Sequence, residues 1–288
     1  MKTEQRVIAC VDQSSYADAV ADHAAWAALR LGAPLELLHV IDRHPETATS
    51  ADHSGALGPD AQEALLNQLS SADEAMVRVA REQGRMFLNR LRERVIATGV
   101  AVVDMRQRLG HLDETLDQLQ GNARLVVMGR KGEAASQSGA ALGGHVERVV
   151  RALDRPILAV GDTPFHEPRR LVLAFDGGSA SRKGVEMVAA SPLYRGMDVY
   201  LVMAGNGRSD AAAQMAWATS RLQDGGVQAQ GEMVSGDPLA AIQAAVDRLQ
   251  ADWLLMGAYT HSPWRSLFRS SLTGALLRSV GLPTLLLR

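Results

Sequence analysis

Continuous apolar runs alternate with helical patterns along the chain. Four runs predict strands: Val7–Val11, Leu35–Ile41, Leu125–Met128 and Ile157–Val160. Apolar residues follow one another in them without alternation, which is typical of strands that helices cover on both faces. Helical spacing predicts helices at Ala17–Leu31, which ends before Gly32, and at Pro238–Leu249, which has proline in its first turn. The pattern therefore indicates an α/β fold with a parallel sheet.

The same order of elements occurs twice. RVIACVDQS at residues 6–14 matches RLVLAFDGGS at 170–179, and RLVVMGRKGE at 124–133 matches DWLLMGAYTH at 252–261. The Pro-rich segment DTPFHEPRR separates the copies. We predict two tandem doubly wound domains, residues 1–164 and 165–288, each with a five-stranded parallel sheet in the order 3-2-1-4-5 flanked by helices.

The last strand of each copy is predicted to be a sheet edge. These strands are Pro156–Val160 and Pro283–Leu287. Because an open edge is a liability, we expect the two strands to bring the copies together as a pseudo-two-fold pair.

The second helix is much longer in the first copy. A polar and apolar pattern runs from Asp60 to Thr98, whereas the second copy has only about Asp210 to Asp224. Two interpretations stay open: a solvated charged face over an apolar seam, or a helix that contacts a protein partner or a second copy in a homodimer.

Composition excludes several classes of protein. Apolar residues make up 47% of the chain and aromatic residues 4%, and 30 basic residues scattered among 32 acidic ones give a net charge of −2. This balance argues against a nucleic-acid or membrane-surface binder. Cys10 is the one cysteine and lies in an apolar run, which predicts a small buried side chain rather than a nucleophile. No disulfide, signal segment or membrane span is expected, so the predicted location is the cytoplasm.

Candidate chemistry lies at the carboxyl ends of the first and fourth strands, where doubly wound sheets bind ligands. Those ends are Asp12 and Met128–Gly129 in copy one, and Asp176 and Met256–Gly257 in copy two. Copy one continues into a glycine-containing loop and a helix that begins near His145. Glycines allow close backbone approach, and a helix N-terminus offers free N–H groups to an anion. We therefore expect a phosphate cradle there, and no metal-ligand set.

The strand-end Asp, the MGxxG turn after strand four, the glycine pair before the last helix and the proline-led final strand resemble the universal stress protein family in tandem form, over essentially the whole chain. The resemblance implies binding of ATP or a related adenine nucleotide, alone or with Mg²⁺. The implied nucleotide-binding residues are Asp12, Val40, Met128, Gly129, Arg130, Lys131, Gly132, Gly143 and Gly144. Of these, Arg130 and Lys131 are expected to approach the phosphates.

Both copies depart from the family fingerprint G-x2-G-x9-G-[ST]. Ten residues separate Gly132 from Gly143, and Gly144 stands in the hydroxyl position. In copy two, Thr260 and Ser270 replace the second and third glycines, although Ser271 keeps the hydroxyl. Copy one is accordingly predicted to be the better nucleotide site.

Other interpretations stay open beside nucleotide binding. Asp12 and Asp176 could each cap the helix that follows. The protein could act as a stress-associated scaffold through its domain or dimer interface. An ATP-hydrolysing or adenylating enzyme ranks third, because the FDGGSAS segment at Phe175–Ser181 matches the pyrophosphate loop of such enzymes poorly and no catalytic constellation can be assembled from the strand ends. We expect a regulatory binding module rather than a dedicated enzyme.

Overall fold

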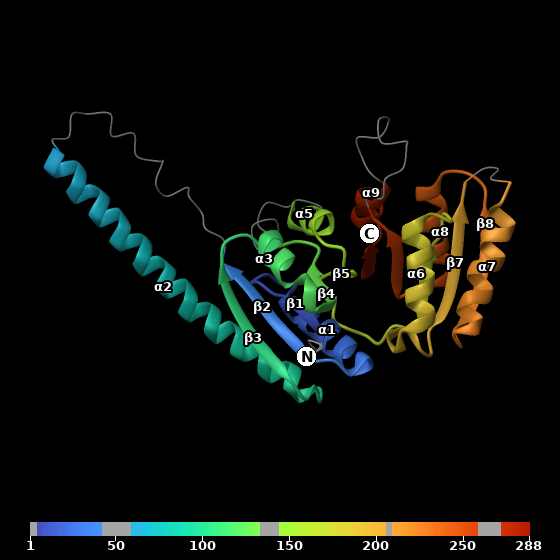
Figure 1. The fold of residues 1–288 in the computed structure, drawn as a ribbon, viewed down its shortest axis with the longest axis horizontal. Coiled ribbons are helices and arrows are strands. Elements are labelled where there is room, and N and C mark those ends of the chain that lie inside the picture. Colours follow the sequence, from blue (N-terminus) through green and yellow to red (C-terminus); the bar gives the residue numbers. More distant parts are fainter. Residues whose placement is uncertain (1–4, 42–58, 133–143, 206–208, 259–271) are drawn as a thin grey trace.

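A single twisted sheet runs through the whole molecule (Figure 1). The computed structural model describes residues 5–41, 59–132, 144–205, 209–258 and 272–288, with side chains in the long second helix from residue 75 onward. Within these ranges the sheet has ten strands in the order β3-β2-β1-β4-β5-β10-β9-β6-β7-β8. Each half therefore has the expected order 3-2-1-4-5 in its own numbering.

The strands of each half are parallel, and the two halves meet in one antiparallel pair. The strands of the first half are β1 (Arg6–Cys10), β2 (Leu35–Ile41), β3 (Val103–Leu109), β4 (Ala123–Gly129) and β5 (Ile157–Val160). Those of the second half are β6 (Arg170–Ala174), β7 (Asp198–Ala204), β8 (Gln228–Val234), β9 (Trp253–Gly257) and β10 (Thr284–Leu287). The inner strands have buried, unalternating sequences that fit a sheet covered on both faces, whereas the outer strands β3 and β8 are more polar and more exposed.

The antiparallel pair joins β5 to β10, with Leu158 opposite Leu285. The pairing predicted for the two final strands is thus confirmed. It closes both edges that would otherwise be open and leaves β3 and β8 as the outer strands of the sheet. The boundary proposed near Pro164 falls between β5 and β6 and stays a prediction.

Helices cover the sheet in two layers. They are α1 (Ala17–Leu31), α2 (Pro59–Ala97), α3 (Leu112–Leu119), α5 (Gly144–Ala152), α6 (Ser179–Ala190), α7 (Ala211–Asp224), α8 (Pro238–Leu249) and α9 (Leu272–Ser279), with short 3-10 turns η2 (Gln120–Asn122) and η3 (Pro192–Tyr194). One core cluster contains buried residues of α1, α2, α6 and α7, and a second contains residues of α3, α5, α8 and α9. Each core continues across both halves, so the halves fold as one layered body.

Helix α2 extends well beyond the sheet (Figure 1). Its C-terminal part is attached to the sheet by Leu88, Leu91 and Val95, which are buried. At Gly84 a Cβ would lie only 2.8 Å from His39 Cδ2 and 2.1 Å from Gln107 Nε2, so glycine allows the helix to approach β2 and β3 closely.

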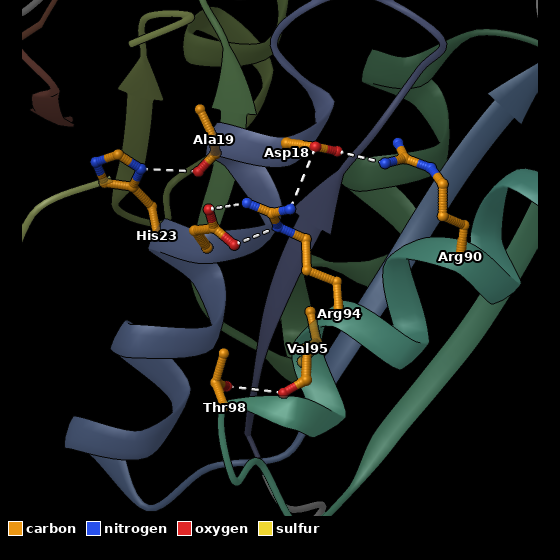
Figure 2. A network of polar contacts seen from close by, with 8 residues as sticks. Asp18, Ala19, His23, Arg90, Arg94, Val95 and Thr98 are labelled. Atoms are coloured by element: carbon orange, nitrogen blue, oxygen red, sulfur yellow. Dashed lines mark hydrogen bonds and ion pairs between the residues drawn. The ribbon is translucent and has the colours of Figure 1, made fainter. Parts of the chain in front are cut away.

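Ion pairs tie α2 to α1. Figure 2 shows Arg90 and Arg94 of α2 reaching Asp18 of α1, at 2.8 and 3.4 Å. Arg94 also forms two bonds to Asp22, at 2.7 and 2.8 Å. These side chains are largely exposed, so they fix the position of the helix more than they stabilise it.

Candidate functional site

A cavity of about 450 Å³ lies at the carboxyl ends of β1, β2 and β4. This is the switch point of the first half, where the chain leaves β1 on one side of the sheet and β4 on the other. Six of the predicted site residues line it: Asp12, Val40, Met128, Gly129, Lys131 and Gly132. The fold thus brings together residues that lie more than a hundred positions apart in the sequence.

Asp12 and Gly132 lie next to each other in the wall of this cavity. A Cβ on Gly132 would lie 3.0 Å from Asp12 Oδ2, tighter than ordinary contact. The other carboxylate oxygen accepts bonds from the Ser14 hydroxyl and from the Ser14 backbone N–H, the latter at 3.2 Å. Helix α1 has Tyr16 as its N-cap, without a side-chain cap bond. Asp12 therefore does not serve as the N-cap of α1, and its carboxylate lies in the cavity wall.

Gly129 occupies the most crowded point of the wall. A Cβ there would lie 2.9 Å from Tyr16 Cβ and 3.0 Å from the Lys131 carbonyl oxygen. The glycine at the end of β4 therefore lets the loop turn closely under Tyr16.

Arg130 corrects one prediction, because its side chain does not approach the cavity. It is buried and donates to the carbonyl oxygens of Leu277, Val280 and Leu282 and to Thr284 Oγ1, all in the second half. Successive residues at a strand end point to opposite sides, so Gly129 and Lys131 line the cavity while Arg130 points away. Burial lowers the pKa of its guanidinium to about 10, so the group stays charged at neutral pH.

Residues that the sequence patterns did not single out complete the wall. Ala80 and Gln83 of α2 and His39 of β2 line the cavity. His39 is buried, and its Nδ1 lies 2.9 Å from the Val11 carbonyl oxygen; a carbonyl only accepts, so Nδ1 carries the proton. A single sequence feature bears on this packing: Gly84 interrupts the helical pattern where α2 approaches β2, although a glycine alone does not say which strand lies beneath it.

The remaining predicted residues lie in or next to the loop after β4. Gly144 is the first residue of α5, whose His145 and Val146 line the cavity. Gly143 lies outside the described residues. Cys10 also lines the cavity, and burial together with the Asp12 carboxylate raises the pKa of its thiol, which agrees with a small apolar role.

The corresponding strand end in the second half uses its carboxylate differently. Asp176 Oδ1 accepts from the Gly178 backbone N–H at 2.8 Å and from Ser181 Oγ at 2.6 Å. The N-cap residue of α6 is Gly178, so Asp176 is not the N-cap of this helix, just as Asp12 is not the N-cap of α1. Thr260, Ser270 and Ser271 lie outside the described residues.

Two further kinds of site, a metal centre and a membrane-spanning helix, bear on what this chain can do. Among the described residues, no three His, Cys, Asp or Glu side chains gather in a way that could hold a metal ion. Within those same ranges, no helix is both long enough and apolar enough to cross a bilayer.

Comparison with known proteins places this architecture. The model of the universal stress protein family matches residues 4–161, more than half of the chain. The chain belongs to the universal stress protein family. It is 28% identical over 287 residues to the universal stress protein Slr1230 of Synechocystis, covering 99% of this chain and all of that one. A solved universal stress protein from Archaeoglobus fulgidus superposes with a TM-score of 0.67 at 16% identity, over 98% of each chain, which shows a shared fold.

Proposed function

We propose that this universal stress protein is a regulatory module that binds ATP or a related adenine nucleotide in the cavity of its first half. The observation that carries the proposal is that Asp12 and the Gly132 backbone lie side by side in the wall of one cavity at the switch point. A volume of about 450 Å³ lies within the range of small-molecule sites.

The cavity wall offers a group for each part of a nucleotide. The backbone from Gly129 to Gly132 and the start of α5 can face the phosphates, with the Lys131 ammonium beside them. Val40, at the end of β2, lines the side where a base would lie. Asp12 can bind a ribose hydroxyl or a phosphate-bound Mg²⁺, for which a carboxylate is a suitable ligand.

The same wall favours binding over turnover. Of the described lining residues, Asp12 is the single carboxylate. The imidazole of His39 is engaged with the Val11 carbonyl, and Nδ1 of His145 accepts from Arg148 at 3.1 Å. General acid–base catalysis of ATP hydrolysis or adenylation would need a second titratable group placed to act together with the Asp12 carboxylate. We therefore place the enzyme alternatives behind the binding module.

Thermal unfolding with and without ligand tests the proposal. The wild-type melting temperature should rise with saturating MgATP, since a ligand at about 100 times its Kd adds roughly 2.7 kcal/mol of stability. Asp12→Asn should fold and lose the rise. If ATP alone gives wild type the same rise as MgATP while Asp12→Asn loses the rise with either, Asp12 contacts the ribose rather than a metal ion. An undiminished rise in Asp12→Asn would contradict the assignment of Asp12.

A matched pair of glycine substitutions localises the site. Gly132→Val should lower ATP affinity in a calorimetric titration at least tenfold, because the new side chain would crowd Asp12. Gly121→Val is the control, since no atom lies within 4 Å of a Cβ built there. A wild-type protein that neither shifts its melt nor gives a titration signal would leave the scaffold interpretation in place.

A further inference from the structure

Helix α2 carries a second apolar face that its own domain does not cover. Met76, Val79 and Met86 are exposed by 62%, 54% and 65%. They lie on a different side of the helix from Leu88, Leu91 and Val95, which pack on the sheet. A helix with two apolar faces requires two partners, and the sheet supplies one.

The spacing of this face is that of a coiled coil. Steps of three and four residues connect Leu65, Leu69, Ala72, Met76, Val79 and Met86, with Gln83 at the position between the last two. The set spans about three heptads, roughly 33 Å of helix. Seams of this kind are covered by another helix.

The charges along α2 indicate which helix that is. Residues 59–74 contain four acidic residues, Asp60, Glu63, Asp73 and Glu74, and no basic one. Residues 75–97 contain six arginines and two glutamates. Arg78, Arg81 and Arg92 of this basic part are exposed. The helix is thus acidic at its start and basic at its end.

We propose that two copies of this chain associate through an antiparallel pairing of their α2 helices. That arrangement places the acidic part of each helix along the basic part of the other and covers both apolar seams at once. A parallel arrangement would set acid against acid and base against base. The contact is two-fold symmetric and uses the same surface on both copies.

One register satisfies both the seam and the charges. The seam residues alternate between two heptad positions, a and d, and an antiparallel coiled coil pairs an a position of one helix with a d position of the other. Met76 of one copy therefore lies opposite Val79 of the second copy. Glu74 then lies level with Arg81, and Glu63 with Arg92, of the other helix. The two helices cross midway between Met76 and Val79, near the boundary of the acidic and basic parts.

Sedimentation equilibrium of the full chain tests the association. One chain has a mass of 30.9 kDa. Wild type should sediment with twice that mass, and the double variant Met76→Glu with Val79→Glu should sediment with the mass of one chain. Ile96→Glu is the matched control, because Ile96 is an exposed apolar residue of the same helix outside the seam, and it should leave the dimer intact. Circular dichroism melts establish that all three proteins are folded.

Cysteine cross-linking tests the orientation, since the chain has one cysteine, Cys10, which is buried. Under mild oxidation, a mixture of Met76→Cys and Val79→Cys chains should form a disulfide dimer, while each variant alone should form little. A parallel pairing would place each cysteine opposite its own copy, so disulfide dimers that form as readily with each variant alone as with the mixture would overturn the antiparallel arrangement. A wild-type chain that stays monomeric at about 100 µM, or a glutamate variant that stays dimeric, would overturn the proposal itself.

Discussion

The two halves share a strand order but differ in the residue that directly follows their fourth strand, a position that we call the corner. Gly129 and Gly257 end β4 and β9, and the next residues are Arg130 and Ala258. Their backbone N–H groups make equivalent bonds, to the Val160 and Leu287 carbonyls. Both following side chains are buried, yet one is a guanidinium and the other a methyl group.

The residue facing each corner changes in step. Arg130 donates to Thr284 at the start of β10, at 2.7 Å, whereas Ile157 begins β5 at the matching position of the first half. The same backbone arrangement thus carries a hydrogen-bonded polar pair, Arg130 and Thr284, at one corner and two apolar residues, Ala258 and Ile157, at the matching positions of the other. Arg130 binds the residues that follow β4, next to the cavity of the first half, to the end of α9 and the start of β10 in the other half.

The largest expected effect comes from removing the polar pair. Arg130→Ala leaves the buried carbonyls of Leu277 and Val280 without this donor, while the Leu282 carbonyl keeps its bond from Thr284 Oγ1. Each unsatisfied buried group costs about 1–3 kcal/mol, so we expect the free energy of unfolding to fall by roughly 2–5 kcal/mol. Urea unfolding measures the loss. Arg124→Ala, which removes one 3.3 Å bond to the Leu31 carbonyl, should cost less than about 1 kcal/mol.

A double variant sharpens the same comparison. Arg130→Ala with Thr284→Ile copies the Ala258 and Ile157 pair into the first corner. It should be more stable than the sum of the two single losses predicts, because the apolar side chain fills space that the guanidinium vacates. Strict additivity in this double-mutant cycle would show that the two corners are unrelated.

The behaviour of Arg130 also shows where sequence reasoning ends. The apolar runs predicted Leu35–Ile41, Ile157–Val160 and the helix Ala17–Leu31 to the residue, because burial and period are local properties. The direction of Arg130 depends on the pleat at the end of β4 and on carbonyls of the other half, about 150 residues away. No pattern within one copy contains that information.

The candidate site likewise has a part that local sequence patterns predict and a part that they do not. Asp12, Gly129, Lys131 and Gly132 follow strand ends, and parallel topology alone brings strand ends to one edge. Gln83 and its neighbours on α2 reach the cavity because of how that helix crosses β2, which depends on tertiary packing. Strand-end residues were therefore predictable and the helical part of the wall was not.

A moderate effect is expected at the first strand end of the second half. Ser181 is buried, and its hydroxyl donates to Asp176 at 2.6 Å, whereas the equivalent residue of α1 is Ala17, which lines the cavity. Ser181→Ala should lower the free energy of unfolding by about 1 kcal/mol. Exposed Ser179→Ala, two residues earlier, should change it by a few tenths at most. Equal losses for the two serines would remove this distinction between the halves.

The smallest effect concerns a histidine at the contact between the halves. His23 of α1 is buried, with its ring 4.9 Å from Phe165 and 6.3 Å from Trp253 of β9. Met187 holds the equivalent place on α6, eleven residues after Asp176 as His23 is after Asp12. Burial lowers the pKa of His23 below 6.5; the bond to the Ala19 carbonyl and the charge of Asp22 act in the opposite direction, and electrostatic repulsion by His166 adds a smaller lowering.

Because the pKa of His23 is lowered in the folded chain, this histidine should make the protein less stable as the pH falls. As the pH falls through 6.5, the unfolded chain binds a proton at this histidine that the folded chain does not, so unfolding becomes easier. His23→Met, which copies the second half, should lose less stability than wild type between pH 7 and pH 5, when urea unfolding is measured at each pH. Because every other titrating group is common to both proteins, the difference between the two curves isolates His23. Parallel curves would show that the His23 imidazole takes up its proton equally well in the folded state.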